Sequence, residues 1–159
     1  MEFEKAYFCL MMNLYTIQTE INGKETHLLS LFDSQALAEL KNNKAIVGIL
    51  KNNNQPIIHD NIIYNPEFVD FFHRTMLAFA EFTAGTNPIG TDGFMYVVDE
   101  RSTTPDKPEQ KDIIGSFEVQ AGVLLKDTYS PNKNYQFIST EGLFKLPAQI
   151  ERVLFMALV

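Results

Sequence analysis

Three residues that could carry acid–base chemistry lie in or just before one strongly apolar stretch of the chain. His59 and Asp60 precede this stretch, and His73 lies within it. A histidine exchanges protons near neutral pH, and a neighbouring carboxylate can orient its ring. If these segments meet in space, the three residues could form an acid–base site of a small hydrolase-like enzyme. This is the most specific catalytic hypothesis that the sequence supports. Such a site also requires a cleft and side chains within hydrogen-bonding reach.

A second pattern concerns metal binding. Glu67, Asp70 and His73 recur at intervals of three residues, so on a helix they follow one side over about two turns. Carboxylate and imidazole groups on one helix face can bind a divalent cation. No HExxH or CxxC motif strengthens this hypothesis. A solvated helix face, with Asp70 paired to His73 or Arg74, is the simpler interpretation.

Nucleotide binding is the third chemistry that the sequence suggests. Gly85 and Gly90 have the spacing of a phosphate-binding loop, but Thr91 stands where the lysine belongs. The loop also follows a predicted helix, whereas a phosphate-binding loop follows a strand. We therefore predict no cofactor.

The segment 99–112 is polar throughout and is longer than the usual connection. It contains the five carboxylates of Asp99, Glu100, Asp106, Glu109 and Asp112. The order of acids and the central glycine of an EF-hand are absent, and Arg101, Lys107 and Lys111 are interspersed. The segment is either a binding loop or a mobile one, and its mixed charge and two prolines favour a solvated, mobile loop.

Three aromatic residues are candidates for a contact surface. Tyr129, Tyr135 and Phe137 lie in or beside segments predicted as strands. Aromatic side chains are enriched in the cores of protein interfaces. They are more common still as ordinary core residues, so burial in the fold is favoured and a contact surface is the alternative.

The clearest helix, predicted over residues 66–84, must position most of these candidates. Asn65 is a good N-cap, and Pro66 suits the first helical position. Phe72 and Phe79 fall on an apolar stripe that is wider than a simple amphipathic face. A helix this apolar is expected to be covered on two sides.

The remaining segments predict several strands and a second long helix. Residues 3–13 are open to either helix or strand, and Asn22-Gly23 favours a hairpin over residues 14–30. Further elements are a short helix at 35–42, a buried strand at 45–50, a central strand at 94–98, a meander through 117–121, 123–125 and 135–138, and a helix at 147–158. In the first meander segment Ser116, Glu118 and Gln120 alternate with apolar residues, which predicts a half-exposed strand.

Strands and helices are segregated along the chain and do not alternate as βαβ units, which favours the α+β class. We predict an antiparallel sheet of about 4–6 strands with the helices at about 66–84 and 147–158 packed on it. The chain has 159 residues and is 45% hydrophobic, so it is expected to form a single globular domain over residues 1–159.

Charge and cysteine content limit the classes of function. A net charge of −7 argues against nucleic-acid binding, which requires a basic surface. Cys9 is the single cysteine, so no intramolecular disulfide can form, and its apolar neighbours indicate a buried, inert thiol. No apolar run reaches the ~20 residues that span a bilayer. We expect a cytoplasmic protein without a membrane partner.

Two classes of function follow. The first is a small acidic, non-catalytic interaction or regulatory module, whose negative charge would steer it to a protein with a basic surface. A homo-oligomer is also compatible with the sequence. The alternative is the hydrolase-like enzyme centred on His59, Asp60 and His73.

Overall fold

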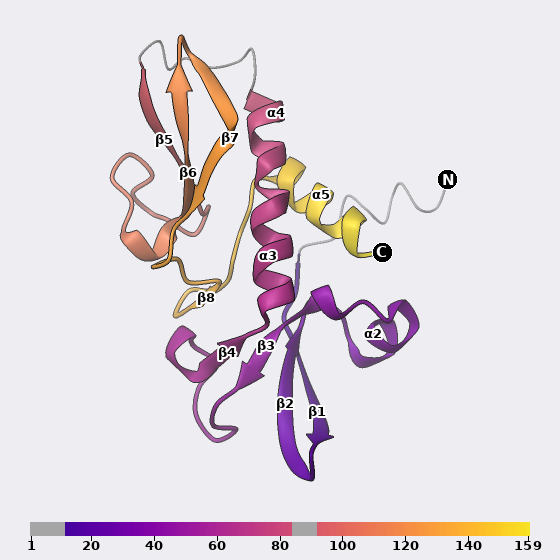
Figure 1. The fold of residues 1–159 in the computed structure, drawn as a ribbon. Coiled ribbons are helices and arrows are strands. Elements are labelled where there is room, and N and C mark those ends of the chain that lie inside the picture. The colour runs from indigo at the N-terminus through magenta and orange to yellow at the C-terminus, as the bar shows by residue number, and fades with distance from the viewer. Residues whose placement is uncertain (1–11, 84–91) are drawn as a thin grey trace. The chain divides into compact units, whose positions relative to one another are not determined.

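The computed structural model describes residues 12–83 and 92–159 (Figure 1). Cys9, most of the 3–13 segment and the loop with Gly85, Gly90 and Thr91 lie outside these ranges, as do the side chains of residues 81–83. The chain divides into two compact units, residues 1–71 with 151–159, and residues 72–150. The single-domain prediction stays a prediction.

The first unit is built around one antiparallel sheet with strand order β1-β2-β3-β4. Its elements are β1 (Tyr15–Ile21), β2 (Lys24–Ser30), α2 (Ser34–Leu40), η1 (Asn43–Ala45), β3 (Ile46–Leu50), η2 (His59–Asn61), β4 (Ile62–Tyr64), the first part of α3 (Pro66–Thr75) and the last part of α5 (Ala148–Leu158). The hairpin over residues 14–30 is confirmed. Asn22 and Gly23 have φ values of 53° and 77°, which suit a two-residue turn between twisted strands.

The second unit contains a three-stranded antiparallel sheet of order β5-β6-β7 and a short β8-β9 hairpin. Its elements, after the end of α3, are α4 (Leu77–Thr83), β5 (Gly93–Val98), η3 (Gln110–Asp112), β6 (Ile113–Gln120), β7 (Val123–Pro131), β8 (Ile138–Ser139), β9 (Gly142–Leu143) and the start of α5. Helix α4 packs against β7. The α+β class and the antiparallel pairing are confirmed, and the strands belong to three sheets of four, three and two strands.

Two predictions about the second unit were wrong. The strand at 94–98 is an edge strand and not a central one, because β6 pairs with β5 on one side and β7 on the other. The meander consists of β5, β6 and β7, whereas residues 135–138 lead into β8, which pairs with β9. Apolar content alone does not distinguish a buried central strand from an edge strand with an exposed apolar face.

The long helix predicted over 66–84 begins as expected but divides near its middle. The Asn65 side chain accepts a hydrogen bond from the Glu67 amide at 3.2 Å, which confirms it as the cap. The Met76 amide donates to both Phe72 and His73 carbonyls, at 3.3 and 3.2 Å. This tighter turn separates α3 from α4.

Each unit has its own apolar core. In the second unit the Phe72 ring, 0% exposed, lies 4.8 Å from the Phe137 ring, 5.0 Å from Phe144 and 5.9 Å from Tyr135, measured between centroids. In the first unit the largest fully buried side chains among the described residues are Leu29, Val47, Phe68, Leu154 and Leu158. The apolar stripes read from the sequence therefore lie where helices and sheets meet.

Candidate functional site

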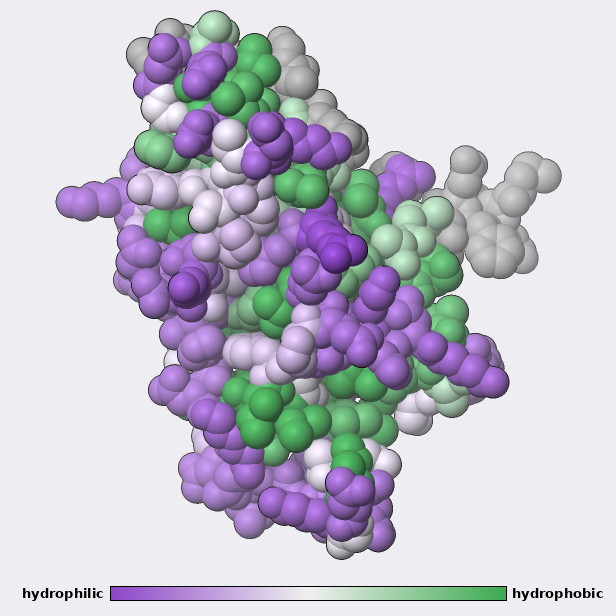
Figure 2. Space-filling model, viewed as in Figure 1, coloured by the Kyte–Doolittle hydropathy of each residue, from purple (hydrophilic) through white to green (hydrophobic). Residues whose placement is uncertain are grey.

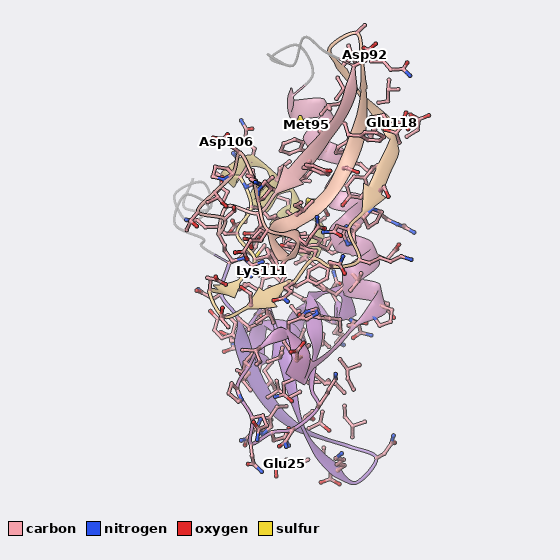
Figure 3. The ribbon with its side chains drawn as sticks, turned by 90° about the vertical axis from the view of Figure 1, so that its left-hand side faces the viewer. Glu25, Asp92, Met95, Asp106, Lys111 and Glu118 are labelled. Atoms are coloured by element: carbon pink, nitrogen blue, oxygen red, sulfur yellow. The ribbon has the colours of Figure 1, made fainter. Side chains whose placement is uncertain are left out.

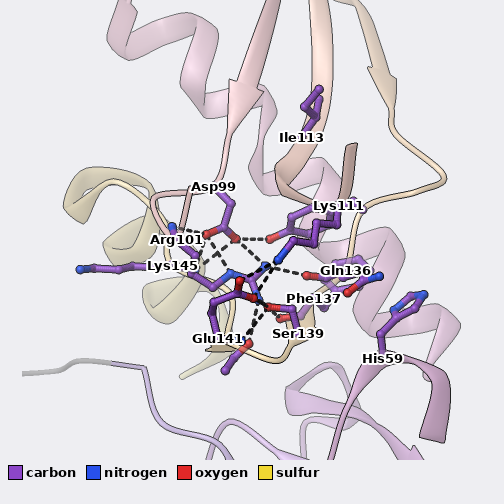
Figure 4. Close-up of polar contacts among 12 residues, drawn as sticks. His59, Asp99, Arg101, Lys111, Ile113, Gln136, Phe137, Ser139, Glu141 and Lys145 are labelled. Atoms are coloured by element: carbon purple, nitrogen blue, oxygen red, sulfur yellow. Dashed lines mark hydrogen bonds and ion pairs between the residues drawn. The ribbon is translucent and has the colours of Figure 1, made fainter. Parts of the chain in front are cut away.

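The polar segment that follows β5 begins with a buried ion pair (Figure 4). The side chains of Asp99 and Arg101 are 0% and 5% exposed. Arg101 Nε donates to Asp99 Oδ1 at 3.0 Å, and Nη2 donates to Oδ2 at 2.9 Å, which is the two-pronged geometry of a strong pair. Tyr135 adds a hydrogen bond from its hydroxyl to Oδ2 at 2.6 Å. The expectation of a solvated segment was wrong here, because a polar sequence does not reveal which charges neutralise one another.

The rest of the Arg101 guanidinium is bound to backbone and side-chain oxygens. Nη1 donates to the Gly142 carbonyl at 2.7 Å and to Ser139 Oγ at 3.1 Å, and Nη2 donates to the Gln136 carbonyl at 2.6 Å. Together with Asp99, these acceptors occupy the five N–H donors of an arginine. Arg101 therefore fastens the β8-β9 hairpin to the end of β5 and has no donor left for a ligand.

The electrostatics agree with a structural role. Burial lowers the pKa of Arg101, but the hydrogen bond and charge of Asp99 outweigh this effect and raise its pKa overall. Burial, reinforced by the charge of Asp99, raises the pKa of Tyr135 well above its ordinary value. Both groups therefore keep their protons at neutral pH.

The network continues outward to an exposed ion pair. Lys111 Nζ donates to the two carboxylate oxygens of Glu141 at 2.8 and 2.9 Å, and Ser139 Oγ donates to the same carboxylate at 2.7 Å. The hydrogen bond from Lys111 is the largest cause that lowers the pKa of Glu141, to about 2. Burial raises the pKa of Asp112, which lies next to Lys111 in the chain. The ion pair between Lys111 and Glu141 connects η3 to the β8-β9 turn.

Backbone bonds hold the two ends of the 99–112 segment. The Asp99 amide donates to the Asp112 carbonyl, and the Glu100 amide donates to the Lys145 carbonyl, each at 2.8 Å. Asp106 and Glu109 are exposed. The mobility of the central part of the segment stays a prediction.

The two candidate histidines each contact a tyrosine hydroxyl within their own unit. In the first unit His59 Nδ1 lies 3.0 Å from the Tyr64 hydroxyl. In the second unit His73 Nδ1 lies 2.7 Å from the Tyr129 hydroxyl, and burial raises the pKa of Tyr129 far above its ordinary value. Asp60 belongs to η2 and lies in the first unit with His59. These contacts fix both rings, and an acid–base site of His59, Asp60 and His73 stays a prediction.

The metal candidates lie on α3 as expected. Glu67 stands in its first turn and His73 in its last. Within the described ranges, however, no group of three or more His, Cys, Asp or Glu side chains is placed to hold a metal ion. A metal site formed by Glu67, Asp70 and His73 stays a prediction.

The three aromatic candidates for a contact surface all pack on other aromatic rings of the second unit. Tyr135 and Phe137 are 3% and 6% exposed, and both pack on Phe72. Tyr129 packs on Phe117 with ring centroids 5.0 Å apart. Tyr135 and Phe137 are therefore buried in the core of the second unit, whereas Tyr129 is half-buried. A contact surface that includes Tyr129 stays a prediction.

Two other aromatic residues are exposed on β5. Phe94 is 70% exposed and Tyr96 is 56% exposed, and their spacing of two residues puts both on the same face of the strand. In the register of the sheet Phe94 pairs with Glu118, and Tyr96 pairs with Ser116. We call Phe94, Tyr96, Glu118 and the adjoining Asp92 the acidic-aromatic face. Figure 3 shows Asp92 and Glu118 near one end of this sheet.

The acidic-aromatic face borders an open hollow of about 590 Å³. Asp92 and Phe94 line it from β5 and the residue before it, and Glu118 lines it from β6. Asp92 Oδ1 accepts a hydrogen bond from the Ala121 amide at 2.8 Å, which fixes the turn between β6 and β7. Carboxylates beside an exposed ring suit a cationic side chain, which gains from both the charge and the ring.

Comparison with known proteins gives no further guide to this site. No family model, no curated protein and no solved structure matches the chain. Among the helices of the described ranges, none is long and apolar enough to cross a membrane.

Proposed function

We propose that this protein is a non-catalytic interaction module that binds a protein with a basic surface through the acidic-aromatic face. The observation that carries the proposal is the exposure of Phe94 and Tyr96 beside Glu118 on an edge strand. Exposed aromatic anchors next to charged groups are typical of the energetic centres of interfaces. A cytoplasmic location belongs to the same proposal.

The exposed rings offer a substantial but limited driving force. At 70% and 56% exposure, two aromatic side chains present roughly 250 Å² of surface that a partner could cover. At 25 cal/mol per Å² this burial is worth about 6 kcal/mol before the cost of association, which is estimated at 4 kcal/mol or more. The rings alone therefore support only weak binding, and specific binding requires a further contribution.

Charge supplies that contribution. Glu118 and Asp92 line the same hollow as Phe94, and the whole chain carries a net charge of −7. Such a field accelerates encounter with a basic partner and disfavours acidic ones. Lysine or arginine on the partner would lie over the Phe94 ring and pair with the Glu118 carboxylate.

The proposal is tested by capturing partners from the lysate of the source organism and measuring the affinity of the purified complex. We expect Phe94→Ser combined with Tyr96→Ser to weaken the complex by roughly 100-fold, because both anchors are removed. Glu118→Lys should weaken it and reduce its sensitivity to salt, since a charge contact is lost.

A matched control is Met156→Ser on α5, which removes a side chain that is 50% exposed but lies in the other unit. Its affinity should equal that of the unchanged protein. Wild-type affinity in the Phe94/Tyr96 variant, with thermal unfolding confirming that it is folded, would refute the role of the acidic-aromatic face.

A further inference from the structure

Strand β5 is an edge of its sheet and lacks the features that usually protect an edge. Among the described residues, no strand pairs with it on the side away from β6. Edge strands are commonly protected by charged residues, by proline or by a covering helix. The opposite edge, β7, contains Lys126, Asp127 and Pro131 and contacts α4, whereas Gly93–Val98 contains no charge and no proline. Strand β5, which Figure 1 shows on the side of the sheet away from α4, is therefore a template for a further strand.

Hydrogen bonds just beyond the end of β5 show which way its backbone faces. The Asp99 amide donates to the carbonyl of Asp112, the residue before β6, at 2.8 Å. The next amide, that of Glu100, donates to the Lys145 carbonyl, which lies outside the β5-β6-β7 sheet, also at 2.8 Å. These two consecutive amides therefore point to opposite sides of the chain, the first toward β6 and the second away from it.

The same alternation, followed back along β5, leaves the amides of Phe94 and Tyr96 at the open edge. Neighbouring amides of an extended strand point to opposite sides. The register shift between β5 and β6 places its extra residue in β6, so the alternation within β5 is unbroken. Counted back from Asp99, the amides of Val97 and Met95 face β6, and those of Tyr96 and Phe94 face away from it. Among the described residues outside β6, none accepts a hydrogen bond from the amide of Phe94 or Tyr96.

The side chains beside the open edge differ between the two faces of β5, and Figure 2 shows hydrophobic and hydrophilic residues side by side over this sheet. Phe94 and Tyr96 are exposed on one face, with Glu118 on the neighbouring strand. On the other face Met95 is half-buried and Val97 is buried. An added strand would lie ~4.8 Å from β5, with its residues alternating between these faces. A lysine beside Phe94 can cross the ring toward Glu118, and an apolar residue suits the position beside Met95.

We propose that an extended segment of the basic partner, in which lysine or arginine alternates with apolar residues, adds to β5 as a fourth strand. This inference rests on the proposed function, because the segment binds at the acidic-aromatic face. Main-chain hydrogen bonds to Phe94 and Tyr96 supply affinity, and the side chains of that face select basic residues. A second copy of the chain does not meet these requirements. Strand β5 offers no basic residue, and two chains of net charge −7 repel each other.

Solvent exchange of backbone amides, measured by NMR on the full chain, tests the open edge directly. The probe is a synthetic peptide with blocked ends, as long as β5, in which lysine alternates with valine. With ~1 mM peptide and an expected dissociation constant of about 100 µM, exchange of the Phe94 and Tyr96 amides should slow roughly 10-fold, because an amide bonded in the complex exchanges only from the free protein. A control peptide with the same residues, grouped into a lysine block and a valine block, should leave both rates unchanged.

Two substitutions at one position separate the backbone from the side chain. Tyr96→Ser removes the ring, whereas Tyr96→Pro removes the ring together with the amide hydrogen. Proline is tolerated on an edge strand where its nitrogen faces solvent, so the fold is expected to survive. We expect Tyr96→Pro to bind the alternating peptide at least ~10-fold more weakly than Tyr96→Ser. Equal affinities would overturn strand addition, and if Tyr96→Pro fails to fold, exchange of the Phe94 amide in the unchanged protein decides.

The outcomes distinguish this inference from the proposed function. Peptide binding that Glu118→Lys weakens, but that leaves the Phe94 and Tyr96 amides exchanging at their free rates, would overturn strand addition alone and leave the basic partner in place. Absence of peptide binding at ~1 mM would also overturn strand addition, whereas the affinity of the purified partner complex decides the proposed function separately. Slowing that rises with protein concentration, with no peptide present, would assign the edge to a second copy and overturn the inference.

Discussion

Removal of the Arg101 side chain is the sharpest test of how the second unit is held together. In the variant Arg101→Met the Asp99 carboxylate keeps its hydrogen bonds from Tyr135 and from the Lys145 amide, but it loses its counter-charge. Methionine fills a similar length without donating a hydrogen bond. The change therefore leaves a buried negative charge together with unpaired carbonyls of the β8-β9 region.

The magnitude follows from the contacts that disappear. The Asp99 side chain is fully buried, and breaking a buried ion pair by removing one partner costs about 3–5 kcal/mol. The carbonyls of Gln136 and Gly142 also lose their donor, and each unpaired buried acceptor costs about 1–3 kcal/mol unless water reaches it. Because the Gly142 carbonyl lies near the surface, water can replace part of this loss, and we expect about 3–5 kcal/mol in total.

Urea denaturation followed by far-UV circular dichroism measures this loss directly. The urea concentration at the midpoint of unfolding should fall. The dependence of the unfolding free energy on urea concentration should stay constant, since the surface exposed on unfolding hardly changes. Arg101→Lys should have an intermediate effect, because it keeps the charge but not the two-pronged geometry. Lys107→Met, an exposed change in the same segment, should stay within about 0.5 kcal/mol of the unchanged protein. A loss below about 1 kcal/mol for Arg101→Met would refute the view that this pair organises the segment.

Two further perturbations test the core and the outer ion pair. Phe72→Ala should lower the free energy of unfolding by about 3–5 kcal/mol, because Phe72 is fully buried, and Phe79→Ala should cost less, because Phe79 is half-buried. Equal urea midpoints for Phe72→Ala and the unchanged protein would contradict this. The folded pKa of Glu141 is about 2, below its ordinary 4.5, so its stabilising effect is present above about pH 5 and is lost as the pH falls toward 2. Thermal unfolding of Glu141→Gln should therefore differ from the unchanged protein at pH 7 and converge with it near pH 2, whereas a difference independent of pH would rule this linkage out.

Several elements could be predicted because their signals are local. The turn at Asn22-Gly23 requires positive φ angles at two consecutive residues, and few sequences supply them at so little cost. The cap at Asn65 and the start of α3 follow from hydrogen bonds between residues two positions apart. The α+β class follows from the order of such segments along the chain.

Predictions about exposure on β5 failed because they depend on a neighbouring strand. The run from Phe94 to Val98 is apolar at every position, so its sequence does not show which face is covered. The information about exposure lay in the sequence of β6, where polar and apolar residues alternate and correctly predict that Glu118 faces solvent. The pairing register of β5 with β6 then determines which face of β5 is exposed, since Phe94 pairs with Glu118 and must lie on the same face of the sheet.

The sequence by itself determined the local features of this protein: its hairpin, helix caps, apolar stripes and acidic charge. Each of these depends on residues within about one helical turn or one hairpin, or on composition alone. Only the tertiary structure paired Asp99 with Arg101 and Tyr135, aligned Ile17, Leu28, Ile49 and Ile63 across four strands, and left Phe94 and Tyr96 exposed. Asp99 and Arg101 are only two residues apart, and Ile17 and Leu28 face each other in one hairpin, but the other relations join residues farther apart in the chain. The energy of all of them depends on which groups exclude water from one another, which no local pattern encodes.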